Sequence, residues 1–586
     1  MKKLRLMIAL LLCAALLSGC AAPQFGGLSS LFNSVFGSDG EIPRFDDMEY
    51  ERPQDALDDI EKNLKQLEEA FEKGSPLSTI TDLLDRCYSD YYHFDTMYTL
   101  ADIRYCQDTT DDYYAGELTW CMDQYGEMRQ HMEDMFYLCG SSSMAEELEE
   151  NYFWEGFAGE YADAGLSVYN DATLALLHRE NALLTEFRDL TSAPVVKLED
   201  GQEVELYSYL AEAESDDYYA ARDAYYRQYN EELSRIYIEL VKVRRELAAE
   251  MGFASYEEMA YAYSFDRDYT AEQAAEYLEE IRTQIAPLYK ELEEYTLDYP
   301  YLDEEELFEV LCRATEEIGG VVEEAFSYMN QYDLFDIRLS MEKASKSFQT
   351  YLSEYDAPYL FIDPYGDDTD VLTFAHEFGH FVDAYYNYDA SESIDLSEVF
   401  SQAMEYLVLD YAEGVLPEDR LENLRRYKWK DTLETFAQQA SFAAFEQAVY
   451  SADPETLDAD FLNDLSLQVA IDYGYYDGVS EEYYALSWVD ITHFFEQPFY
   501  VISYPVSNDL ALQIWELEQE ERGAGLEKYL EALPRNYYGM MDTAEAVGLD
   551  NPLAPGRIAK IAADLRENLG ITGSGFSAQI GSHKAA

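Results

Sequence analysis

The sequence predicts a mainly helical protein with a few short β-strands. Apolar residues recur at spacings of three and four along most of the chain, and charged residues fill the positions between them. One such run is Leu233, Ile236, Leu240, Val243 and Leu247. Of the 586 residues, 48% are hydrophobic and 15% are aromatic, which is enough to fill a large core. A chain that is disordered throughout is therefore excluded.

The first residues are expected to be a targeting signal rather than part of the fold. Three basic residues precede an apolar run from Met7 to Leu17, which is too short to cross a bilayer as a finished transmembrane helix. The tetrapeptide Leu-Ser-Gly-Cys at 17–20 looks like a bacterial lipobox, in which Cys20 becomes the lipid-modified first residue. We therefore expect a lipoprotein anchored on the outer face of the cell membrane. Gly and Ser residues after Cys20 indicate a flexible tether.

The net charge excludes one large class of partners. The chain has 119 acidic and 39 basic residues, a formal net charge of -80, so its averaged field repels phosphate backbones and anionic headgroups. No nucleic-acid partner is expected. A solvated, colloidally stable surface accounts for this acidity without a basic partner. Downstream of the signal, no stretch reaches the roughly 18 uninterrupted apolar residues of a membrane span.

The seven cysteines indicate no metal site. Cys13 would leave with the signal, and Cys20 would carry lipid. The remaining five form no close CxxC pair, so a metal ion bound by cysteine is not expected. The sequence leaves open a disulfide among Cys87, Cys106, Cys121 and Cys139.

Three local elements can be placed from the pattern. An amphipathic helix is expected from Pro53 to Gly74, with a proline at its start and a glycine at its end. Two short alternating runs around Asp200-Gly201 predict a β-hairpin over Val195 to Leu206. A β-rich run at Ala357 to Asp363 predicts a strand just upstream of the strongest chemical signal.

That signal is the HExxH sequence formed by His376, Glu377 and His380 in an apolar helical frame. Residues four apart lie on one helical face, so both imidazoles can bind one zinc ion with Glu377 beside a bound water. Zinc would lower the pKa of this water, and Glu377 would take its proton and later pass it to the leaving amine. The alternative is two solvated helix histidines, but the chain places two of only seven histidines in this pattern.

A catalytic zinc ion normally has three protein ligands and an open position. Our candidate for the third ligand is Glu398, with Asp395 and Glu392 as rivals because an acidic chain offers many carboxylates. Glu405 lies two turns further along the same helical face and could orient a ligand imidazole. On the residues alone, a surface carboxylate is the better explanation of Glu398.

Peptide hydrolysis also needs hydrogen-bond donors for the oxyanion that forms when water attacks the carbonyl. The aromatic stretch from Trp488 onward offers His493, Tyr500 and Tyr504. Taken alone, these residues would be interpreted as core aromatics.

Together these segments resemble the zinc metallopeptidase family of oligoendopeptidase F and thimet oligopeptidase. The likeness is carried by HEFGH at 376–380, SEVFSQAME at 397–405 and the His-Phe-Phe to Tyr segment at 493–504. Weaker likeness extends over roughly residues 190 to 550, and three ordered motifs are far more specific than HExxH alone. The resemblance implies a nearly all-helical body with a deep substrate channel and zinc on its floor.

The resemblance also implies the roles of the site residues. His376, His380 and Glu398 would bind one Zn²⁺ per chain, and Glu377 would be the base. The remaining assignments are His493 and Tyr504 as catalytic residues at the oxyanion and Tyr500 as a substrate-binding residue. Asp383 stands where the family commonly has another histidine, so altered surroundings of the metal are expected rather than its loss.

On this interpretation the chain hydrolyses internal bonds of short oligopeptides at the cell surface. One alternative is a zinc carboxypeptidase on a related helical fold, which needs a cation for the substrate's terminal carboxylate, yet no Lys or Arg near His493 in the sequence supplies one. Another is a catalytically inactive peptide-binding lipoprotein, against which the complete motif argues. Cobalt or manganese would also suit two imidazoles and one carboxylate.

The expected partners are oligopeptides and, through the lipid on Cys20, the membrane. Oligomeric state and cleavage-site preference stay open. The expected division of the chain is a signal peptide at 1–19, a lipid-anchored tether at 20–42, an N-terminal helical region at 43–190, a helical zinc peptidase catalytic region at 191–555, and a C-terminal helix with a flexible tail at 556–586.

Overall fold

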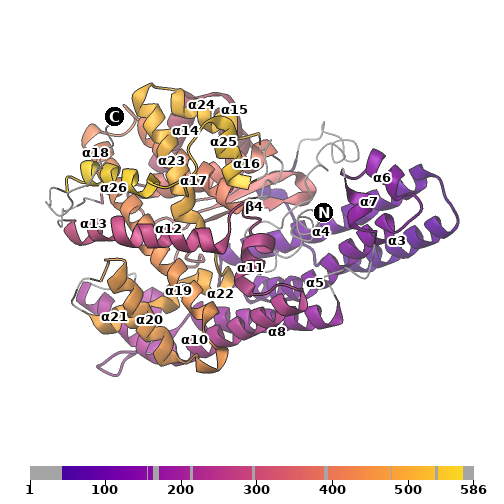
Figure 1. The fold of residues 1–586 in the computed structure, drawn as a ribbon, viewed down its shortest axis with the longest axis horizontal. Helices are drawn as coiled ribbons and strands as arrows, with labels where there is room; N and C mark the ends of the chain where they lie inside the picture. The colour runs from indigo at the N-terminus through magenta and orange to yellow at the C-terminus, as the bar shows by residue number, and fades with distance from the viewer. Residues whose placement is uncertain are drawn as a thin grey trace, which may run out of the picture.

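Helices dominate the computed structural model, and two small sheets accompany them (Figure 1). The structure describes residues 42–154, 156–162, 170–210, 215–292, 297, 299–387, 393–476, 478, 480–534 and 539–571. The predicted fold class is confirmed. The predicted signal peptide, Cys20, nearly all of the tether and the C-terminal tail lie outside the described residues. The predicted boundaries at 190 and 555 stay predictions.

The N-terminal helices form a lobe that extends to the right of the body in Figure 1. They are α3 (Gln54–Glu72), α4 (Leu77–Gln107), α5 (Asp112–Gly140), α6 (Ala145–Asn151), α7 (Phe157–Glu160) and α8 (Asp171–Thr191). The predicted helix at 53–74 is thus α3, whose buried face packs on α4. The buried faces of α4 and α5 join the same core that runs into the body, so the lobe is continuous with it.

The body contains two groups of helices, between which α12 runs in Figure 1. The upper group in this view includes α14 (Glu304–Ile318), α15 (Gly320–Tyr332), α16 (Asp370–Asn387), α17 (Ile394–Tyr411), α18 (Glu418–Glu434), α23 (Ser503–Glu520), α24 (Ala524–Ala532), α25 (Gly539–Val547) and α26 (Arg557–Asn568). The lower group includes α10 (Ser215–Glu250), α19 (Ala440–Ser451), α20 (Ala459–Asp472), α21 (Glu481–Leu486) and α22 (Thr492–Glu496). Shorter or connecting helices are α9 (Leu206–Leu210), α11 (Tyr256–Met259), α12 (Ala271–Gln284) and α13 (Ala286–Glu291).

The two predicted β elements are confirmed. Strands β1 (Val195–Lys197) and β2 (Glu203–Glu205) form the expected antiparallel hairpin. The predicted run at 357–363 contains β5 (Ala357–Phe361), which is buried along its whole length. It lies between β3 (Phe335–Asp336), to which it is parallel, and β4 (Phe348–Leu352), to which it is antiparallel. Helix α16 packs on β5, so this sheet supports the helix that carries HExxH.

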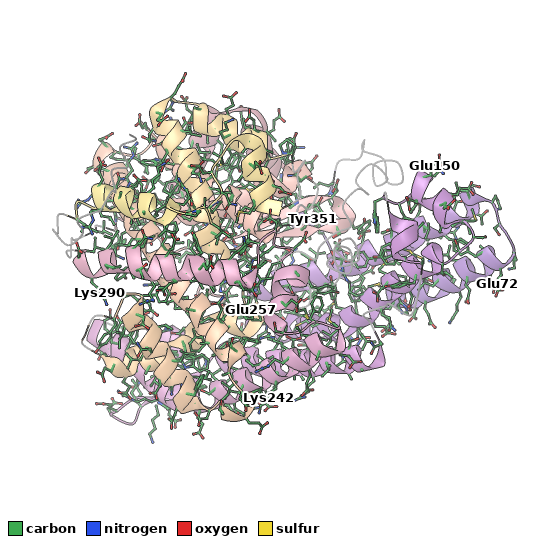
Figure 2. All side chains as sticks on the ribbon, viewed as in Figure 1. Glu72, Glu150, Lys242, Glu257, Lys290 and Tyr351 are labelled. Carbon is green, nitrogen blue, oxygen red and sulfur yellow. The ribbon has the colours of Figure 1, made fainter. Side chains whose placement is uncertain are left out.

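The cysteines and the surface charges are now placed. Cys87, Cys106, Cys121 and Cys139 are buried free thiols, so the disulfide that the sequence left open is not formed. Charged side chains cover the outside, as Glu72 and Glu150 do at the far end of the lobe in Figure 2.

Among the helices of the described residues, none combines the length and the apolar composition that crossing a bilayer requires.

Helices α16 and α17 lie in close backbone contact at Gly379, inside the HExxH sequence. A Cβ atom on Gly379 would lie 2.5 Å from the carbonyl oxygen of Phe400 and 2.6 Å from the Cα of Ser401. These are backbone atoms of α17 that cannot move aside as a side-chain tip can. Only a glycine therefore allows this separation of the two helices.

Gly379→Ala is expected to lower stability by about 1–3 kcal/mol, because the added methyl group overpacks the contact with α17. The measurement is the thermal unfolding midpoint by circular dichroism. Gly116→Ala is the matched control, since a Cβ atom added to this helical glycine of α5 would meet no other atom within 4 Å. The control should be neutral or stabilising by up to about 1 kcal/mol. Equal midpoints for the Gly379→Ala variant and the parent would contradict this account.

Candidate metal centre

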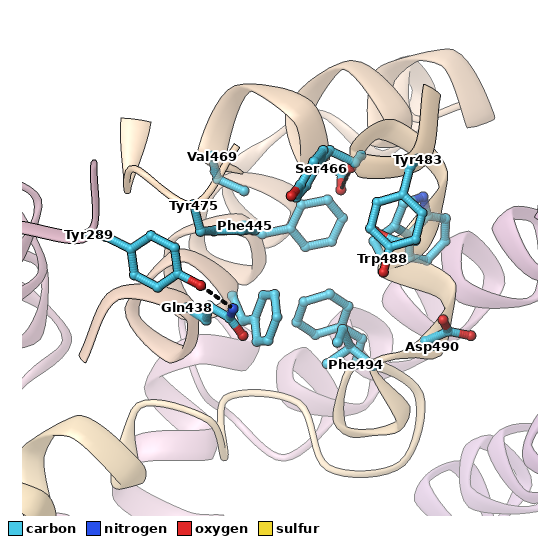
Figure 3. A pocket seen from close by; sticks show the side chains of 14 residues that line it. Tyr289, Gln438, Phe445, Ser466, Val469, Tyr475, Tyr483, Trp488, Asp490 and Phe494 are labelled. Carbon is cyan, nitrogen blue, oxygen red and sulfur yellow. Dashed lines mark hydrogen bonds between the residues drawn. The ribbon is translucent and has the colours of Figure 1, made fainter. Parts of the chain in front are cut away.

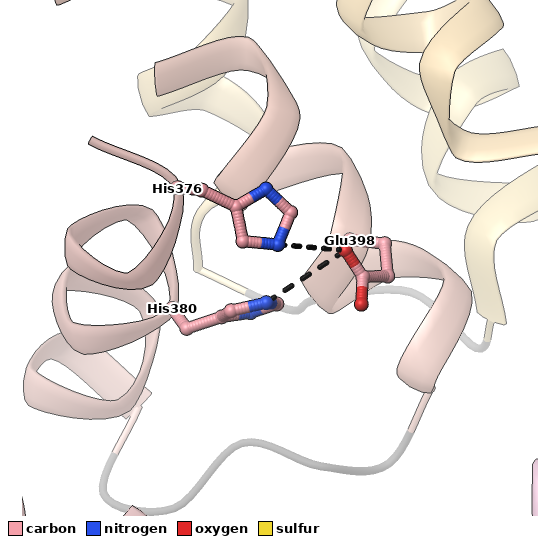
Figure 4. Close-up of side chains that lie close together, drawn as sticks. All are labelled: His376, His380 and Glu398. Carbon is pink, nitrogen blue, oxygen red and sulfur yellow. Dashed lines mark ion pairs between the residues drawn. The ribbon is translucent and has the colours of Figure 1, made fainter. Parts of the chain in front are cut away.

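Three side chains from α16 and α17 point to one position in space (Figure 4). His376 Nε2 lies 3.4 Å from Glu398 Oε2, and His380 Nε2 lies 3.7 Å from the same oxygen. Ligands at about 2.1 Å from a tetrahedral zinc ion are separated from one another by about 3.4 Å. The donor set of two imidazoles and one carboxylate, and its spacing, therefore fit a zinc ion.

The other ring nitrogen of each histidine is held by a neighbour. The Nδ1 of His376 lies 2.9 Å from Glu405 Oε1, and the Nδ1 of His380 lies 2.9 Å from Ser397 Oγ. These contacts fit Nδ1–H donors and turn both Nε2 atoms toward Glu398. Lys428 donates to the second oxygen of Glu405 at 2.6 Å and so fixes that carboxylate. Glu405 was predicted to lie beside a ligand imidazole, and the structure places it beside His376.

The Glu398 carboxylate is oriented by two hydroxyl groups. Tyr500 donates to Oε1 at 2.5 Å, and Ser401 donates to Oε2 at 2.9 Å. Glu398 is almost completely buried, so its direction is set by these contacts rather than by solvent. Tyr500 was assigned to the substrate backbone from the resemblance, whereas in the structure its hydroxyl engages the candidate ligand.

Glu377 lies beside this triangle but outside it. Its side chain is buried, and burial raises its pKa to about 7, which suits a group that must accept and return a proton near neutral pH. Burial opposes protonation of His376, but the carboxylates of Glu405 and Glu398 outweigh it and raise the pKa of His376 to about 9.

The rival carboxylates are engaged elsewhere or not described. Asp395 accepts a hydrogen bond from Nε of the buried Arg267 at 3.3 Å, and this ion pair gives Asp395 a structural role. Glu392 lies outside the described residues. Asp383 accepts a hydrogen bond from Asn387 at 2.9 Å, one turn beyond the HExxH sequence.

The oxyanion candidates come from two helices, with His493 in α22 and Tyr504 in the first turn of α23. Tyr504 Oη is 3.3 Å from His493 Nε2, and the His493 ring centroid is 5.2 Å from that of Tyr500. Since Tyr500 bonds to Glu398, the three residues are contiguous with the metal ligands. Burial lowers the pKa of His493, which favours its neutral form.

A buried arginine holds the turn that carries these tyrosines. Arg267 Nη2 donates to the Phe499 carbonyl at 2.9 Å and to Ser503 Oγ at 2.8 Å. Phe499 has a positive φ of 69°, an unfavourable conformation for an aromatic residue that needs such support. Tyr500 follows directly, so the strained residue sets the direction of its side chain.

A second buried arginine fixes α22 itself. Arg244 Nη1 donates to the Phe494 carbonyl at 3.2 Å, and its Nη2 donates to the carbonyl of Phe495. Its Nε pairs with Glu180 of α8 at 2.6 Å. The helix that bears His493 is thus tied to α10 and α8.

An aromatic cavity of about 300 Å³ lies next to α22 (Figure 3). Ile491 and Phe494, which flank His493 in the sequence, form part of its wall. The Gln438 amide donates to the Tyr289 hydroxyl across it at 3.4 Å. The other lining residues are Phe442, Phe445, Ser466, Val469, Tyr475, Tyr483, Tyr484, Ser487, Trp488 and Asp490.

The sequence analysis did not identify several residues that support the site. Ser397 lies inside a segment already singled out, so its proximity to the motif was a usable signal. The sequence contains no comparable signal for Lys428 or Arg267, because each is far from the motifs in sequence and contacts them only in the folded chain. The fold also places Arg188 beside α22, although no cation is near His493 in the sequence.

Comparisons with known families and solved structures add independent findings. The description Peptidase M3 N-terminal domain matches residues 45–159, and Peptidase family M3 matches residues 325–552. No curated protein matches the chain by sequence.

Among solved structures, one assigned as oligoendopeptidase F superposes with a TM-score of 0.78 at 23% identity, covering 90% of this chain and 99% of its own. A structure of PZ peptidase A with an inhibitor superposes with a TM-score of 0.77 at 22% identity, covering 90% of this chain and 99% of its own. A structure from Bacillus anthracis assigned as oligoendopeptidase F gives 0.72 at 23%, covering 91% of this chain and 99% of its own. At these identities the likeness establishes the fold.

Glu405→Gln is expected to weaken zinc binding about 10–100-fold, because a neutral amide no longer supports the charge on His376. Lys428 would keep a partner, since it also donates to Asp431 at 2.9 Å. Competition with a chromophoric chelator measures the affinity. The control is Glu422→Gln, an exposed residue of α18, which should bind zinc as the parent does. An unchanged affinity for the Glu405→Gln variant would show that the contact does not support the metal.

Proposed function

The chain belongs to peptidase family M3, and on this premise we propose that it is a zinc-dependent oligopeptidase that hydrolyses internal bonds of short peptides. The single observation that carries the proposal is the triangle of His376, His380 and Glu398, whose donor atoms all lie within 4.8 Å of one another. Zinc held there would act as a Lewis acid, which lowers the pKa of water and polarises the carbonyl of a peptide bond.

Glu377 is the proposed general base. Its carboxylate is buried beside the two ligand imidazoles and has a pKa raised to about 7. It would accept the proton of the attacking water and then return it to the nitrogen of the leaving amine. A carboxylate with an ordinary pKa could accept this proton less readily.

His493 and Tyr504 are the proposed donors for the oxyanion. The Tyr504 hydroxyl lies 3.3 Å from His493 Nε2, and two buried arginines fix α22 and the turn between α22 and α23, so the two donors need little reorganisation during the reaction. Tyr500 is proposed to hold Glu398 in place through its 2.5 Å hydrogen bond, in addition to the role at the substrate backbone that the resemblance implies.

The substrate and the cellular location are also proposals. The aromatic cavity beside α22 offers apolar walls with a few hydroxyl groups, which suits a large peptide side chain. The lipobox-like sequence at Cys20 supports an anchor on the outer face of the cell membrane. A peptidase held there would trim peptides outside the cell, in a form suited to uptake.

Peptides of graded length distinguish this proposal from its alternatives. The fragment beginning after Cys20 is incubated with them in the presence and absence of a chelator, and the products are identified by mass spectrometry. Internal cuts that stop with chelator support the oligopeptidase. Sequential loss of C-terminal residues supports a zinc carboxypeptidase, and binding without cleavage supports an inactive peptide-binding lipoprotein.

Glu377→Gln should keep the zinc content and lower kcat by about 10²–10⁴-fold, because an amide cannot take up the proton. Zinc content by mass spectrometry and kcat with a quenched fluorescent peptide give the two readouts. Parental kcat in the Glu377→Gln variant would refute the proposed mechanism, whereas loss of zinc would make this residue a structural part of the site.

Tyr504→Phe should lower kcat by about 10–10³-fold with little change in KM, because only the developing oxyanion loses a donor. The control is Tyr113→Phe, whose side chain is 56% exposed on the N-terminal lobe and should have parental kinetics. A rise in KM at constant kcat would place Tyr504 in substrate binding instead.

A further inference from the structure

Phe499, in the turn between α22 and α23, is held in a strained backbone conformation. Its φ of 69° lies in the left-handed region, which an aromatic residue rarely adopts. Three tyrosine rings pack around its own, with centroid distances of 5.0 Å to Tyr450 and 6.2 Å to both Tyr256 and Tyr261. These contacts fix the side chain but satisfy no backbone group, so the backbone needs partners of its own.

Glu446 supplies the acceptor for the backbone amide of this residue. Its Oε1 accepts a hydrogen bond from the Phe499 N–H at 2.8 Å, and its side chain is completely buried. Glu446 lies four residues before Tyr450, so one face of α19 contacts both the amide and the ring of Phe499. The Phe499 carbonyl accepts from Arg267 Nη2 at 2.9 Å. The strained residue is therefore held separately at its ring, its amide and its carbonyl.

Glu446 acts at this position as an acceptor rather than as a counter-ion. The two nearest buried cations already have carboxylate partners. Arg244 pairs with Glu180 at 2.6 Å, and Arg267 pairs with Asp395 at 3.3 Å. Burial raises the pKa of Glu446 to about 8, so its carboxyl group is mostly protonated near neutral pH.

The second oxygen of Glu446 makes a role in stability alone a poor explanation. Glu446 Oε2 has no hydrogen-bond partner within the part of the chain that the structure describes. An unsatisfied buried polar atom costs free energy, and this cost offsets what the single hydrogen bond to Phe499 contributes. The contact is therefore better explained by the geometry that it imposes on the turn.

Tyr500 is the next residue, and the direction of its side chain depends on this turn. Its hydroxyl donates to Glu398 Oε1 at 2.5 Å, and its ring stands edge-on to Phe265 with centroids 5.9 Å apart. Hydrogen bonds weaken steeply as their angle departs from linear. A rotation of the backbone at Phe499 would move the Tyr500 hydroxyl away from the candidate ligand.

We propose that Glu446 is a positioning residue for the metal centre, which holds the Phe499 amide so that the Tyr500 hydroxyl meets Glu398. This inference rests on the proposed function, because it takes Glu398 as a zinc ligand. Losing a group that orients a ligand typically weakens metal binding by about 10–100-fold. A purely structural role for Glu446 predicts a change in stability without a specific change in zinc affinity.

Zinc affinity, measured by competition with a chromophoric chelator, tests this coupling. Glu446→Leu removes the acceptor and should weaken zinc binding about tenfold. Glu446→Gln keeps a carbonyl oxygen for the Phe499 amide and should bind zinc as the parent does. Val449→Ala is the matched control, because Val449 is equally buried on α19 and has no polar group that could hold the turn. This control should lower the thermal midpoint by leaving a cavity and keep the parental zinc affinity.

A double-mutant cycle shows whether the effect passes through Tyr500. Tyr500→Phe removes the hydroxyl that bonds to Glu398 and should itself weaken zinc binding. If Glu446 acts through this hydroxyl, Glu446→Leu should add no further loss in the Tyr500→Phe background. Additive losses, or a Glu446→Gln variant that behaves like Glu446→Leu, would overturn the proposal.

Hydrogen exchange of the zinc-free chain measures the turn itself. Exchange over residues 497–504 should be faster in Glu446→Leu than in the parent, and unchanged in Glu446→Gln and Val449→Ala. If the leucine variant does not fold, Glu446→Asp replaces it, because the shorter side chain withdraws the acceptor by about 1.5 Å and should change exchange and zinc affinity in the same directions. Unchanged exchange would show that Glu446 does not hold the turn.

The two proposals fail in different ways. A parent chain that binds no zinc defeats the proposed function, while hydrogen exchange still decides whether Glu446 holds the turn. A parent that binds zinc and cleaves peptides, with the same zinc affinity in Glu446→Leu, defeats the positioning role and leaves the peptidase intact.

Discussion

The close approach of α16 and α17 at Gly379 is the constraint on which the candidate centre depends. Glu398 lies on α17, two and three residues before Phe400 and Ser401, whose backbone atoms face the glycine, and the imidazoles lie on α16 on either side of Gly379 in the sequence. A larger separation between the two helices would move Glu398 Oε2 away from the Nε2 atoms of His376 and His380. The glycine of HEFGH therefore acts through backbone packing, and the histidines and Glu377 act through chemistry.

Buried cations hold the elements around this helix pair. In an acidic chain with only 39 basic residues, Arg244, Arg267 and Lys428 are all buried and paired. Removing one member of such a pair typically costs about 3–5 kcal/mol, because the other charge is left without compensation. Their partners are Glu180, Asp395 and Glu405, and each contact joins segments far apart in the sequence. The site is thus positioned by a few directional contacts inside an apolar core.

The turn before α23 shows how local strain and tertiary support combine. Phe499 occupies the left-handed region, with its carbonyl bound by Arg267 and its amide donating to Glu446 at 2.8 Å. Both peptide groups are thereby satisfied in a conformation that the residue would not adopt in isolation. Tyr500 follows directly and Tyr504 lies in the first turn of α23, so their distances to Glu398 and His493 depend on residues from α19 and from the α11–α12 connection.

The sequence by itself determined the elements whose information is local. Helical periodicity predicted the mainly α fold, alternation around Asp200-Gly201 predicted the hairpin, and the spacing of four in HExxH placed both imidazoles on one face. The choice of Glu398 over Asp395 required the resemblance to a family, because one carboxylate on a helix looks like another. Only the tertiary structure decided that Asp395 pairs with Arg267, that Lys428 supports Glu405, that the four cysteines stay unpaired, and that Arg188 of α8 pairs with Glu496 of α22. Their contacts join residues far apart along the chain, so they arise from the packing of whole helices and leave no periodicity in the sequence.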